Sequence, residues 1–265
     1  MSIRVAIIGV GGRMGRALLC AIGETPDMRL AAAVARPGSA VIGQDAGTLV
    51  GHAPSGVSIV ADPVAVLPQV DVAIDFSRVD ASARNAAACA AAGVPLLIGT
   101  TGQDAAQLAA IDAAARQTAV LVAANTSLGL NVLSELVRRA AAALPAGFDI
   151  EIFETHHRHK VDAPSGTALA LGDAAAAGRG HALQRPVPLT GSEPGPRQPG
   201  GIGFAVARGG DVVGEHEVRF LGAGEQLRLA HVATDRAIFA RGALAAARWL
   251  AGRAPGRYRM SDFLF

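Results

Sequence analysis

Short apolar runs alternate with helical patterns along the first half of the chain. Runs rich in Val, Ile, Leu and Ala predict strands buried on both faces, because such strands carry few polar positions: 3–8, 29–35, 57–60, 70–76, 94–98 and 119–123. The segments between them predict helices at 13–22, 80–92 and 103–116. Strands that alternate with helices in this way predict a parallel, doubly wound α/β sheet.

The pattern changes in the second half. Residues 149–155 alternate polar and apolar positions, which predicts a strand with one face in water. More strands are expected at 202–208, 212–220 and 225–233, running antiparallel, with turns at 209–211 and 222–224. Helices are expected at 128–144, from Ser165 to about residue 177, and at 236–250, and the proline-rich segment 180–201 predicts a mobile loop.

These elements predict two domains. Residues 1–127 form the parallel sheet, and residues 128–235 form an α+β domain built on a mostly antiparallel or mixed open sheet. Residues 236–265 form a C-terminal helix and tail that return to the first domain. A chain of 265 residues with 51% hydrophobic side chains is long enough to bury a core in each domain.

A glycine-rich segment joins the first predicted strand to the first helix: Gly9-Val10-Gly11-Gly12-Arg13-Met14-Gly15. Glycines at these places let the chain turn sharply and let the backbone approach a pyrophosphate, while the helix N-terminus offsets its charge. The segment therefore predicts a dinucleotide site on a Rossmann-type fold. The alternative is a glycine-rich turn that binds no nucleotide.

The end of the second predicted strand indicates which dinucleotide binds. NAD-specific sites place an acidic residue here to bind the ribose 2′-hydroxyl, but this chain has Ala35 followed by Arg36. An arginine without a neighbouring carboxylate favours the 2′-phosphate of NADPH. We expect NADPH to be preferred, with NADH possible; the alternative is that Arg36 is an ordinary surface residue.

Polar loops follow three later strands of the sheet, at 75–77, 99–102 and 125–127. In open parallel sheets ligands bind outside the carboxyl ends of the strands. The last two loops are therefore expected to lie beside the nicotinamide and its ribose, although each alone is also ordinary turn chemistry.

A cluster of titratable residues follows the strand at 149–155. It contains His156, His157 and His159, and also Lys160, which is the only lysine among the 24 lysine and arginine residues. A lysine amine can be tuned to give up a proton near neutral pH, whereas arginine cannot, so we expect a lowered pKa for Lys160 and a proton-donating role. The alternative is a charged loop end.

The helix after this cluster is expected to bind an anion. Ser165 is a typical N-cap, with Gly166 and Thr167 in the first turn. Unpaired N–H groups and the positive end of the helix dipole favour a carboxylate or phosphate there. A proton donor beside an anion site suggests a small acidic substrate.

Charge and cysteine content exclude several classes. The formal net charge is +2 and no Lys/Arg block occurs, so nucleic acid is not an expected partner. Cys20 and Cys89 lie in predicted helices and indicate no disulfide framework. No signal-peptide pattern and no apolar run of about 18 residues occurs, so we expect a soluble, cytoplasmic protein without a membrane partner.

Taken together, several motifs resemble the dihydrodipicolinate reductase family over essentially the whole chain. They are the glycine segment 9–15, Gly99-Thr100-Thr101-Gly102, Ala124-Asn125-x-Ser127-x-Gly129, the signature from Glu154 to Thr167, and the segments 201–204 and 214–216. The resemblance implies NAD(P)H-dependent reduction of 4-hydroxy-tetrahydrodipicolinate to tetrahydrodipicolinate and water, in diaminopimelate and lysine biosynthesis. It implies a cofactor domain, then a substrate domain that also builds a homotetramer.

The resemblance also implies the roles of individual residues. His156 would be the proton donor and Lys160 its partner acid; His157, Lys160, Ser165, Gly166 and Thr167 would hold the dicarboxylate substrate. The cofactor residues would be Gly9, Val10, Gly11, Gly12, Arg13, Met14, Arg36, Gly99, Thr100, Thr101, Ala123, Ala124, Asn125 and Thr126. Ala35 and Thr126 depart from many members, which have an acidic and, in some, an aromatic residue there.

Three other functions remain open from sequence. His156, His157 and His159 could hold zinc, but they lack a Cys or carboxylate at the usual spacing, so no metal is expected. The chain could be an NADP-binding redox sensor without turnover, although no DNA- or partner-binding patch is visible. It could also reduce another small carboxylated imine or keto acid.

Overall fold

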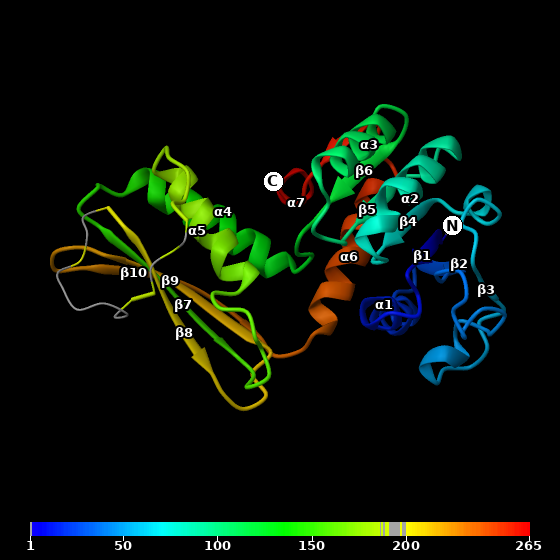
Figure 1. Ribbon diagram of the computed structural model, residues 1–265, viewed down its shortest axis with the longest axis horizontal. Helices are drawn as coiled ribbons and strands as arrows, with labels where there is room; N and C mark the ends of the chain where they lie inside the picture. The colour runs from blue at the N-terminus through cyan, green and yellow to red at the C-terminus, as the bar shows by residue number, and fades with distance from the viewer. Residues whose placement is uncertain (1, 186, 188, 191–196, 198–199) are drawn as a thin grey trace. The chain divides into compact units, whose positions relative to one another are not determined.

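The structure is a computed structural model that describes residues 2–185, 187, 189–190, 197 and 200–265. The chain divides into two compact units, Met1–Ser127 with Ala237–Phe265, and Leu128–Arg236 (Figure 1). Ten residues of the predicted mobile loop at 180–201, namely 186, 188, 191–196 and 198–199, lie outside the described residues.

A seven-stranded sheet forms the first unit, and every strand in it is parallel to its neighbours. The strand order is β11-β6-β5-β4-β1-β2-β3, so the chain moves outward from β1 in one direction and from β4 in the other. The predicted doubly wound sheet is confirmed. The strands are β1 Ile3–Ile8, β2 Met28–Val34, β3 Ile59–Val60, β4 Val72–Asp75, β5 Leu96–Ile98, β6 Ala119–Val122 and β11 Gly256–Tyr258.

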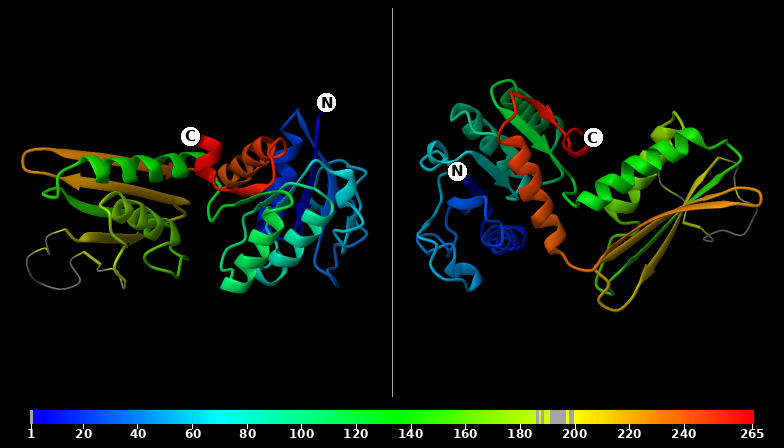
Figure 2. Two further views of the ribbon diagram at one scale, coloured as in Figure 1. Left: turned by 90° about the horizontal axis from the view of Figure 1, so that it is seen from above. Right: turned by 180° about the vertical axis from the view of Figure 1, so that it is seen from behind.

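Helices cover both faces of this sheet. One face packs against α1 (Arg13–Gly23) and α6 (Ala237–Leu250), which share a core cluster with the strands. The other face packs against α2 (Val79–Ala91) and α3 (Ala105–Ala115), as Figures 1 and 2 show. The sheet is therefore buried on both faces, which explains why its strands are continuous apolar runs. Short 3₁₀ turns lie at Thr48–Val50 and Leu67–Gln69.

The sequence did not predict two elements at the C-terminus. Strand β11 adds to the edge of the sheet beside β6, and helix α7 (Met260–Leu264) follows it. Trp249 of α6 contacts the rings of Tyr258 and Phe263, with centroids 5.4 Å and 5.8 Å away. A three-residue strand next to Arg and Gly has no periodicity to detect, and these ring contacts fix its place.

The second unit is one mixed sheet with two helices on one face. Its strands are β7 Asp149–His156, β8 Ile202–Arg208, β9 Gly214–Leu221 and β10 Gln226–Ala233, in the order β10-β9-β7-β8. Helices α4 (Leu128–Ala143) and α5 (Gly166–Gly178) pack together on the sheet and share its core cluster. The predicted mixed open sheet is confirmed.

The predicted pairing of the strands at 202–208 and 212–220 is wrong. Strand β7 lies between them, parallel to β8 and antiparallel to β9. The turn after β8 therefore spans two strand spacings, about 10 Å, instead of closing a tight hairpin. Gly209 donates its N–H to the carbonyl of His156, which fixes this turn against β7. The predicted turn between β9 and β10 does join an antiparallel pair.

Candidate active site

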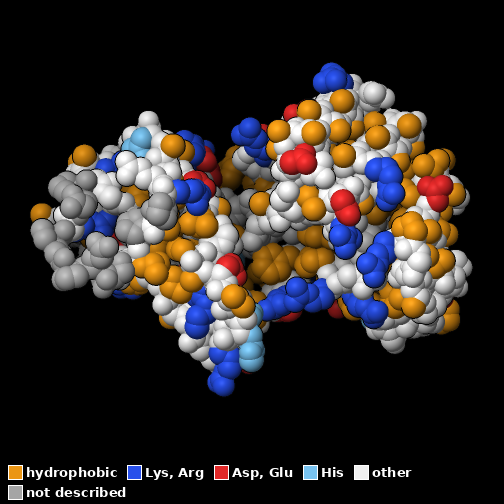
Figure 3. Space-filling view, viewed as in Figure 1, with side chains coloured by type: hydrophobic (Ala, Val, Ile, Leu, Met, Phe, Trp, Pro, Cys, Tyr) orange, Lys and Arg blue, Asp and Glu red, His pale blue; other side chains and the backbone are white. Residues whose placement is uncertain are grey.

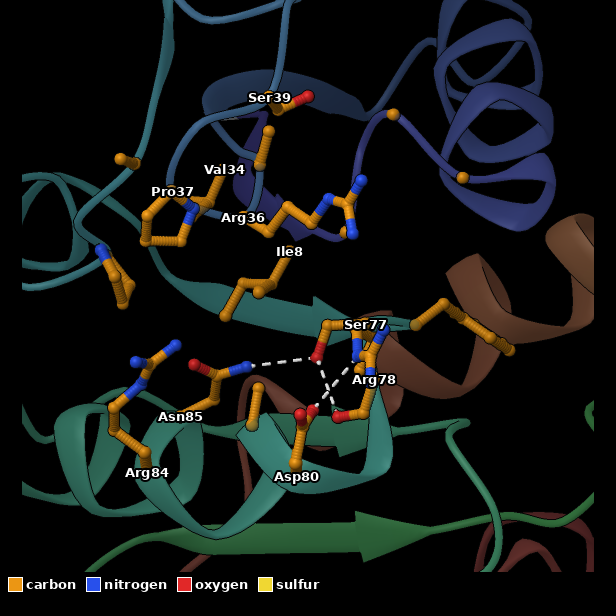
Figure 4. A pocket seen from close by; sticks show the side chains of 18 of the residues that line it. Ile8, Val34, Arg36, Pro37, Ser39, Ser77, Arg78, Asp80, Arg84 and Asn85 are labelled. Atoms are coloured by element: carbon orange, nitrogen blue, oxygen red, sulfur yellow. Dashed lines mark hydrogen bonds and ion pairs between the residues drawn. The ribbon is translucent and has the colours of Figure 1, made fainter.

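The first unit contains a cavity of about 740 Å³ at the carboxyl ends of β1, β2 and β4. Its walls come from the glycine loop, the segment after β2, and the turn and first part of helix α2 (Figure 4). This is the point where the strand order reverses, which is where doubly wound sheets bind nucleotides.

Two glycines of the loop have no room for a side chain. Gly9 has φ +88°, and a Cβ there would lie 2.6 Å from the carbonyl oxygen of Phe76. A Cβ on Gly15 would lie 2.3 Å from the carbonyl oxygen of Gly9, so only glycine lets α1 begin this close to β1. The loop geometry fits a bound pyrophosphate at the N-terminus of α1.

Arginines line the cavity from two sides. Arg36 follows β2, whereas Arg78 and Arg84 belong to the start of α2 and its N-cap (Figure 4). In the space-filling view several arginine side chains gather on the visible face of this unit, with acidic side chains among them (Figure 3). Sequence reasoning missed Arg78 and Arg84, since their helix positions resemble a solvated face.

A buried carboxylate shapes the turn after β4. Asp75 is fully buried and accepts hydrogen bonds from the N–H of Ser77 at 2.7 Å and from Asn85 Nδ2 at 3.0 Å. Burial raises the pKa of Asp75, and these hydrogen bonds oppose the rise only in part. The turn therefore holds Ser77 and Asn85 in the cavity wall by contacts made beneath it.

Only part of the predicted cofactor set lines this cavity: Gly9, Gly11, Gly12 and Arg36. Val10 is fully buried beneath the loop, and Thr126 is 2% exposed because its hydroxyl donates to the carbonyl of Phe239 at 2.7 Å. Gly99 packs against the Phe76 ring, and the hydroxyl of Thr100 donates to the carbonyl of Ser77. The remaining predicted residues, Arg13, Met14, Thr101, Ala123, Ala124 and Asn125, also lie outside the cavity lining.

In the second unit, a period of two places polar groups on the core face of β7. Ile150 and Ile152 pack into the core, and Glu154 and His156 continue the same face where α5 begins. Across the sheet, β9 places His216 opposite Glu154, and β8 places Arg208 beside His156. The hydrophobic core thus ends in a polar cluster built from three strands.

Glu154 lies at the centre of this cluster. Its Oε1 accepts hydrogen bonds from the backbone N–H of Ser165 and from Arg208 Nη2, both at 2.9 Å. Its Oε2 lies 3.1 Å from His156 Nδ1 and 3.8 Å from His216 Nε2. Burial opposes ionisation of Glu154, but the bonds from Ser165 and Arg208 outweigh it, so its pKa lies below the usual value.

The two histidines of the cluster are buried and meet edge to face, with ring centroids 5.0 Å apart. Burial lowers the pKa of His216 to about 4, and the neighbouring His156 adds to the effect. Burial also lowers the pKa of His156, against the attraction of Glu154; the charge of Lys160 lowers it further. Lys160 is thus close enough to affect the imidazole of His156, the partner predicted for it from sequence.

The predicted N-cap is confirmed. The hydroxyl of Ser165 accepts from the N–H of Ala168 at 3.1 Å and lies 3.2 Å from His216 Nε2. The first turn of α5, with Gly166 and Thr167, follows directly, so its N–H groups begin at the polar cluster.

The remaining residues of the histidine segment lie around this cluster. Lys160 Nζ donates to both carboxylate oxygens of Asp162, at 2.9 Å and 2.8 Å, and this bond lowers the pKa of Asp162. The rings of His157 and His159 lie 6.3 Å apart, and His159 is exposed.

Sequence reasoning missed four residues here: Glu154, Asp162, Arg208 and His216 as members of the site. The alternation of β7 was visible and could have placed Glu154 with His156. The partners on β8 and β9 depend on strand order, which the sequence did not give correctly.

The possible metal donors also differ from the expected ones. Among the described residues, Glu154, His156 and His216 each offer one donor atom, all within 4.8 Å of one another, and this set excludes His157 and His159. However, Arg208 already neutralises the same carboxylate, and a second cation beside it would be repelled. The arrangement therefore favours a proton-transfer cluster over a metal centre.

Comparison with known proteins decides the family. Residues 3–126 match the family described as dihydrodipicolinate reductase, N-terminus, and residues 129–264 match dihydrodipicolinate reductase, C-terminus. The chain belongs to the dihydrodipicolinate reductase family. The resemblance seen in the sequence motifs is thus confirmed over nearly the whole chain.

Individual members of the family agree with this. The 4-hydroxy-tetrahydrodipicolinate reductase of Thiobacillus denitrificans is 52% identical over 266 residues, covering 100% of this chain and 99% of that protein. A dipicolinate-bound dihydrodipicolinate reductase from Paenisporosarcina sp. TG-14 has a TM-score of 0.79 at 25% identity and covers 98% of both chains. A myo-inositol dehydrogenase from Corynebacterium glutamicum shares the fold alone, with a TM-score of 0.62 at 16% identity, covering 100% of this chain and 93% of that chain.

In the part of the chain that the structure describes, no helix is long and apolar enough to cross a membrane.

Proposed function

We propose that this chain reduces 4-hydroxy-tetrahydrodipicolinate to tetrahydrodipicolinate and water with NAD(P)H, in diaminopimelate and lysine biosynthesis. The observation that carries the proposal is the buried Glu154–His156 pair at the N-cap of α5, which joins a proton donor to an anion site. The dinucleotide cavity of the first unit and the full-length relatives named for this reaction support it.

The cofactor would be held by the first unit. Gly9, Gly11 and Gly12 offer a close approach to a pyrophosphate, and Arg36 offers a guanidinium to a 2′-phosphate. The loops at 99–101 and 123–126, with Val10, Arg13 and Met14, remain assigned to it through the family resemblance. We expect NADPH to be preferred to NADH, and when bound it supplies the hydride.

The second unit would bind and protonate the substrate. The N–H groups of Gly166 and Thr167 and the side chains of His157 and Lys160 would hold the two carboxylates. Loss of water from the substrate leaves a conjugated imine. Hydride addition to that imine leaves negative charge on the ring, so a positioned acid is needed, and His156 with Lys160 supplies the proton. Glu154 stabilises the imidazolium form of His156 when that form is needed.

The location and assembly follow from the same assignment. We expect the chain to act in the cytoplasm, where small biosynthetic intermediates are made. We also expect a homotetramer built through the sheet of the second unit. Helices α4 and α5 occupy one face of that sheet, and Phe153 and Val232 lie on the other, where Val232 is 59% exposed. Sedimentation analysis tests the tetramer.

A coupled assay tests the reaction. Pyruvate, aspartate semialdehyde and the synthase that joins them generate the substrate, and loss of nicotinamide absorbance is followed for wild type, Lys160→Ala and His156→Gln. We expect oxidation that depends on the synthase and falls by about 100-fold or more in either variant, the scale of a lost general acid. Arg158→Ala, which removes an exposed cation of the same segment, should keep full activity.

Two results would contradict the assignment. Binding of NADPH without oxidation under any of these conditions would favour a redox-sensing protein. Oxidation of other carboxylated imines or keto acids, but not of the synthase product, would favour a different reductase of the same fold.

A further inference from the structure

One buried carboxylate contacts both halves of the site in the second unit. Glu154 Oε1 accepts from the N–H of Ser165, the N-cap of the α5 anion site, while Oε2 faces His156 Nδ1 at 3.1 Å. The Glu154 side chain is 1% exposed, so these contacts are not weakened by water. Any movement of this carboxylate would move the anion site and the proton donor together.

We propose that Glu154 is the positioning residue of this active site, and that it sets His156 and the α5 N-terminus in register for one dicarboxylate substrate. The inference rests on the proposed function and deepens it. Its two oxygens have separate tasks: Oε1 fixes where the substrate carboxylate binds, and Oε2 orients the ring that protonates the substrate.

The unfilled contact at Oε2 supports this division. Glu154 Oε2 and His156 Nδ1 are both buried, and neither makes a hydrogen bond with any described residue although they are 3.1 Å apart. A modest rotation of the ring would align Nδ1–H with Oε2. Catalytic hydrogen bonds are often misaligned before the substrate binds and tighten in the complex, so an incomplete bond is expected at this point.

The surroundings of the ring restrict where it can rotate. His216 meets it edge to face from β9, and a Cβ on Gly214 would lie 3.0 Å from His156 Nε2. Because Gly214 has no side chain, space remains beside His156 Nε2, which is the nitrogen that must face the substrate. Arg208, Lys160 and Asp162 complete the charged groups around the ring, and Arg208 binds Oε1 and leaves Oε2 to the histidines.

Glu154→Gln separates the two tasks. The amide oxygen can still accept from Ser165 and Arg208, but the amide NH₂ then faces Nδ1 and cannot accept from it. We expect kcat in the synthase-coupled assay to fall by about 30-fold or more, with KM for the substrate within about threefold of wild type. Ser165→Ala should give the opposite split, raising KM more than it lowers kcat.

Two further variants control the interpretation. Glu154→Asp keeps the charge beside Arg208 but is one methylene too short to reach Ser165 and His156 together, so a folded variant with both constants impaired is expected even if Glu154→Gln fails to fold. Asp173→Asn removes an exposed carboxylate of α5 that pairs with Arg185, and its kinetics should equal wild type.

Binding measurements separate this proposal from the proposed function. Pyridine-2,6-dicarboxylate binding, measured by calorimetry, and hydrogen exchange of the amides at 165–168 need no turnover. Absence of turnover in the wild-type protein would contradict the proposed function. Even then, the positioning role predicts that Glu154→Asp weakens the binding of pyridine-2,6-dicarboxylate and speeds the exchange of the amides at 165–168. Wild-type kcat in Glu154→Gln or Glu154→Asp would overturn the positioning role, as would a stoichiometric metal found in wild type and lost from Glu154→Gln.

Discussion

At the scale of single residues, Arg36 is expected to select the cofactor. It lies in the cavity wall directly after β2, where the ribose 2′-phosphate of NADPH would bind. The neighbouring Ala35 has no carboxylate that would repel this phosphate. We predict that Arg36→Ala raises Kd for NADPH by about 10- to 100-fold, the value of one or two charge-assisted hydrogen bonds, and leaves Kd for NADH within about twofold. Titrations that follow the fluorescence of NADPH and of NADH measure the two Kd values.

The matched control for Arg36 is Arg29→Ala, which removes an exposed arginine of β2 that does not line the cavity. Equal losses of NADPH and NADH affinity in Arg36→Ala would show that Arg36 contacts a part common to both cofactors.

His216 is expected to make the second unit sensitive to acid. Its pKa is lowered to about 4, so between pH 6.5 and 4 the unfolded chain binds a proton that the folded unit does not. The free energy of unfolding is therefore highest above pH 6.5 and falls with decreasing pH, by up to about 3 kcal/mol for this group. His216→Gln should flatten this dependence but not abolish it, because the pKa of His156 is also lowered.

Hydrogen exchange of β7 and β9 peptides measures this effect, since the single Trp and the single Tyr both lie in the first unit. His181→Gln, at an exposed position of the same unit, should retain the wild-type pH dependence. If the free energy of unfolding depends on pH in His216→Gln as it does in wild type, that dependence belongs to other groups.

Residue types located only part of this site. Three histidines within four residues, a single lysine and a serine before a helix are unusual enough in sequence to single out His156, Lys160 and Ser165, which the structure places in or beside the polar cluster. Glu154 needed the register of β7, and Arg208 and His216 needed the order of strands far apart in sequence. The roles of these three residues depend on burial and on strand pairing, which the local sequence around each residue does not show.

At the scale of elements, the start of α1 depends on glycine packing. A Cβ on Gly15 would lie 2.3 Å from the carbonyl oxygen of Gly9 and 2.6 Å from Val10 Cα, so the helix would have to move off the sheet. We predict that Gly15→Ala destabilises the first unit by about 1–3 kcal/mol and greatly weakens NADPH binding. Thermal unfolding followed by Trp249 fluorescence measures the stability.

Gly252→Ala is the control for this strain, because a Cβ there meets nothing within 4 Å. It should leave both stability and cofactor affinity near wild type. A stable Gly15→Ala variant that binds NADPH normally would mean that the loop can relax without losing the pyrophosphate site.

Elements with a strong local sequence pattern were predicted correctly, whereas one pairing of strands was not. The buried strands and the glycine-to-helix junction of the first unit were predictable because long apolar runs and turn residues agree there. Strands β8 and β9 looked like a hairpin because each alternates and glycines separate them, yet β7 inserts between them. Pairing across the sheet is a non-local choice, and here β7, β8 and β9 all contribute side chains to the one core cluster under α4 and α5.

At the scale of the whole molecule, each unit has a core of its own. Two apolar clusters lie on the faces of the seven-stranded sheet, and a third lies under α4 and α5. The chain passes between the units at Ser127–Leu128 and at Arg236–Ala237. Each unit is expected to bind one ligand, so the two ligands are expected to stabilise different parts of the chain.

Hydrogen exchange with each ligand alone tests this division. A ligand at about 100 times its Kd stabilises the part that binds it by about 2.7 kcal/mol, which slows exchange through unfolding of that part about 100-fold. NADPH should protect β1, α1 and β4, and pyridine-2,6-dicarboxylate should protect the end of β7 and the start of α5. Protection of both units to the same extent by either ligand would show that they unfold as one body, whereas protection of the second unit alone by NADPH would contradict the assignment of one ligand to each unit.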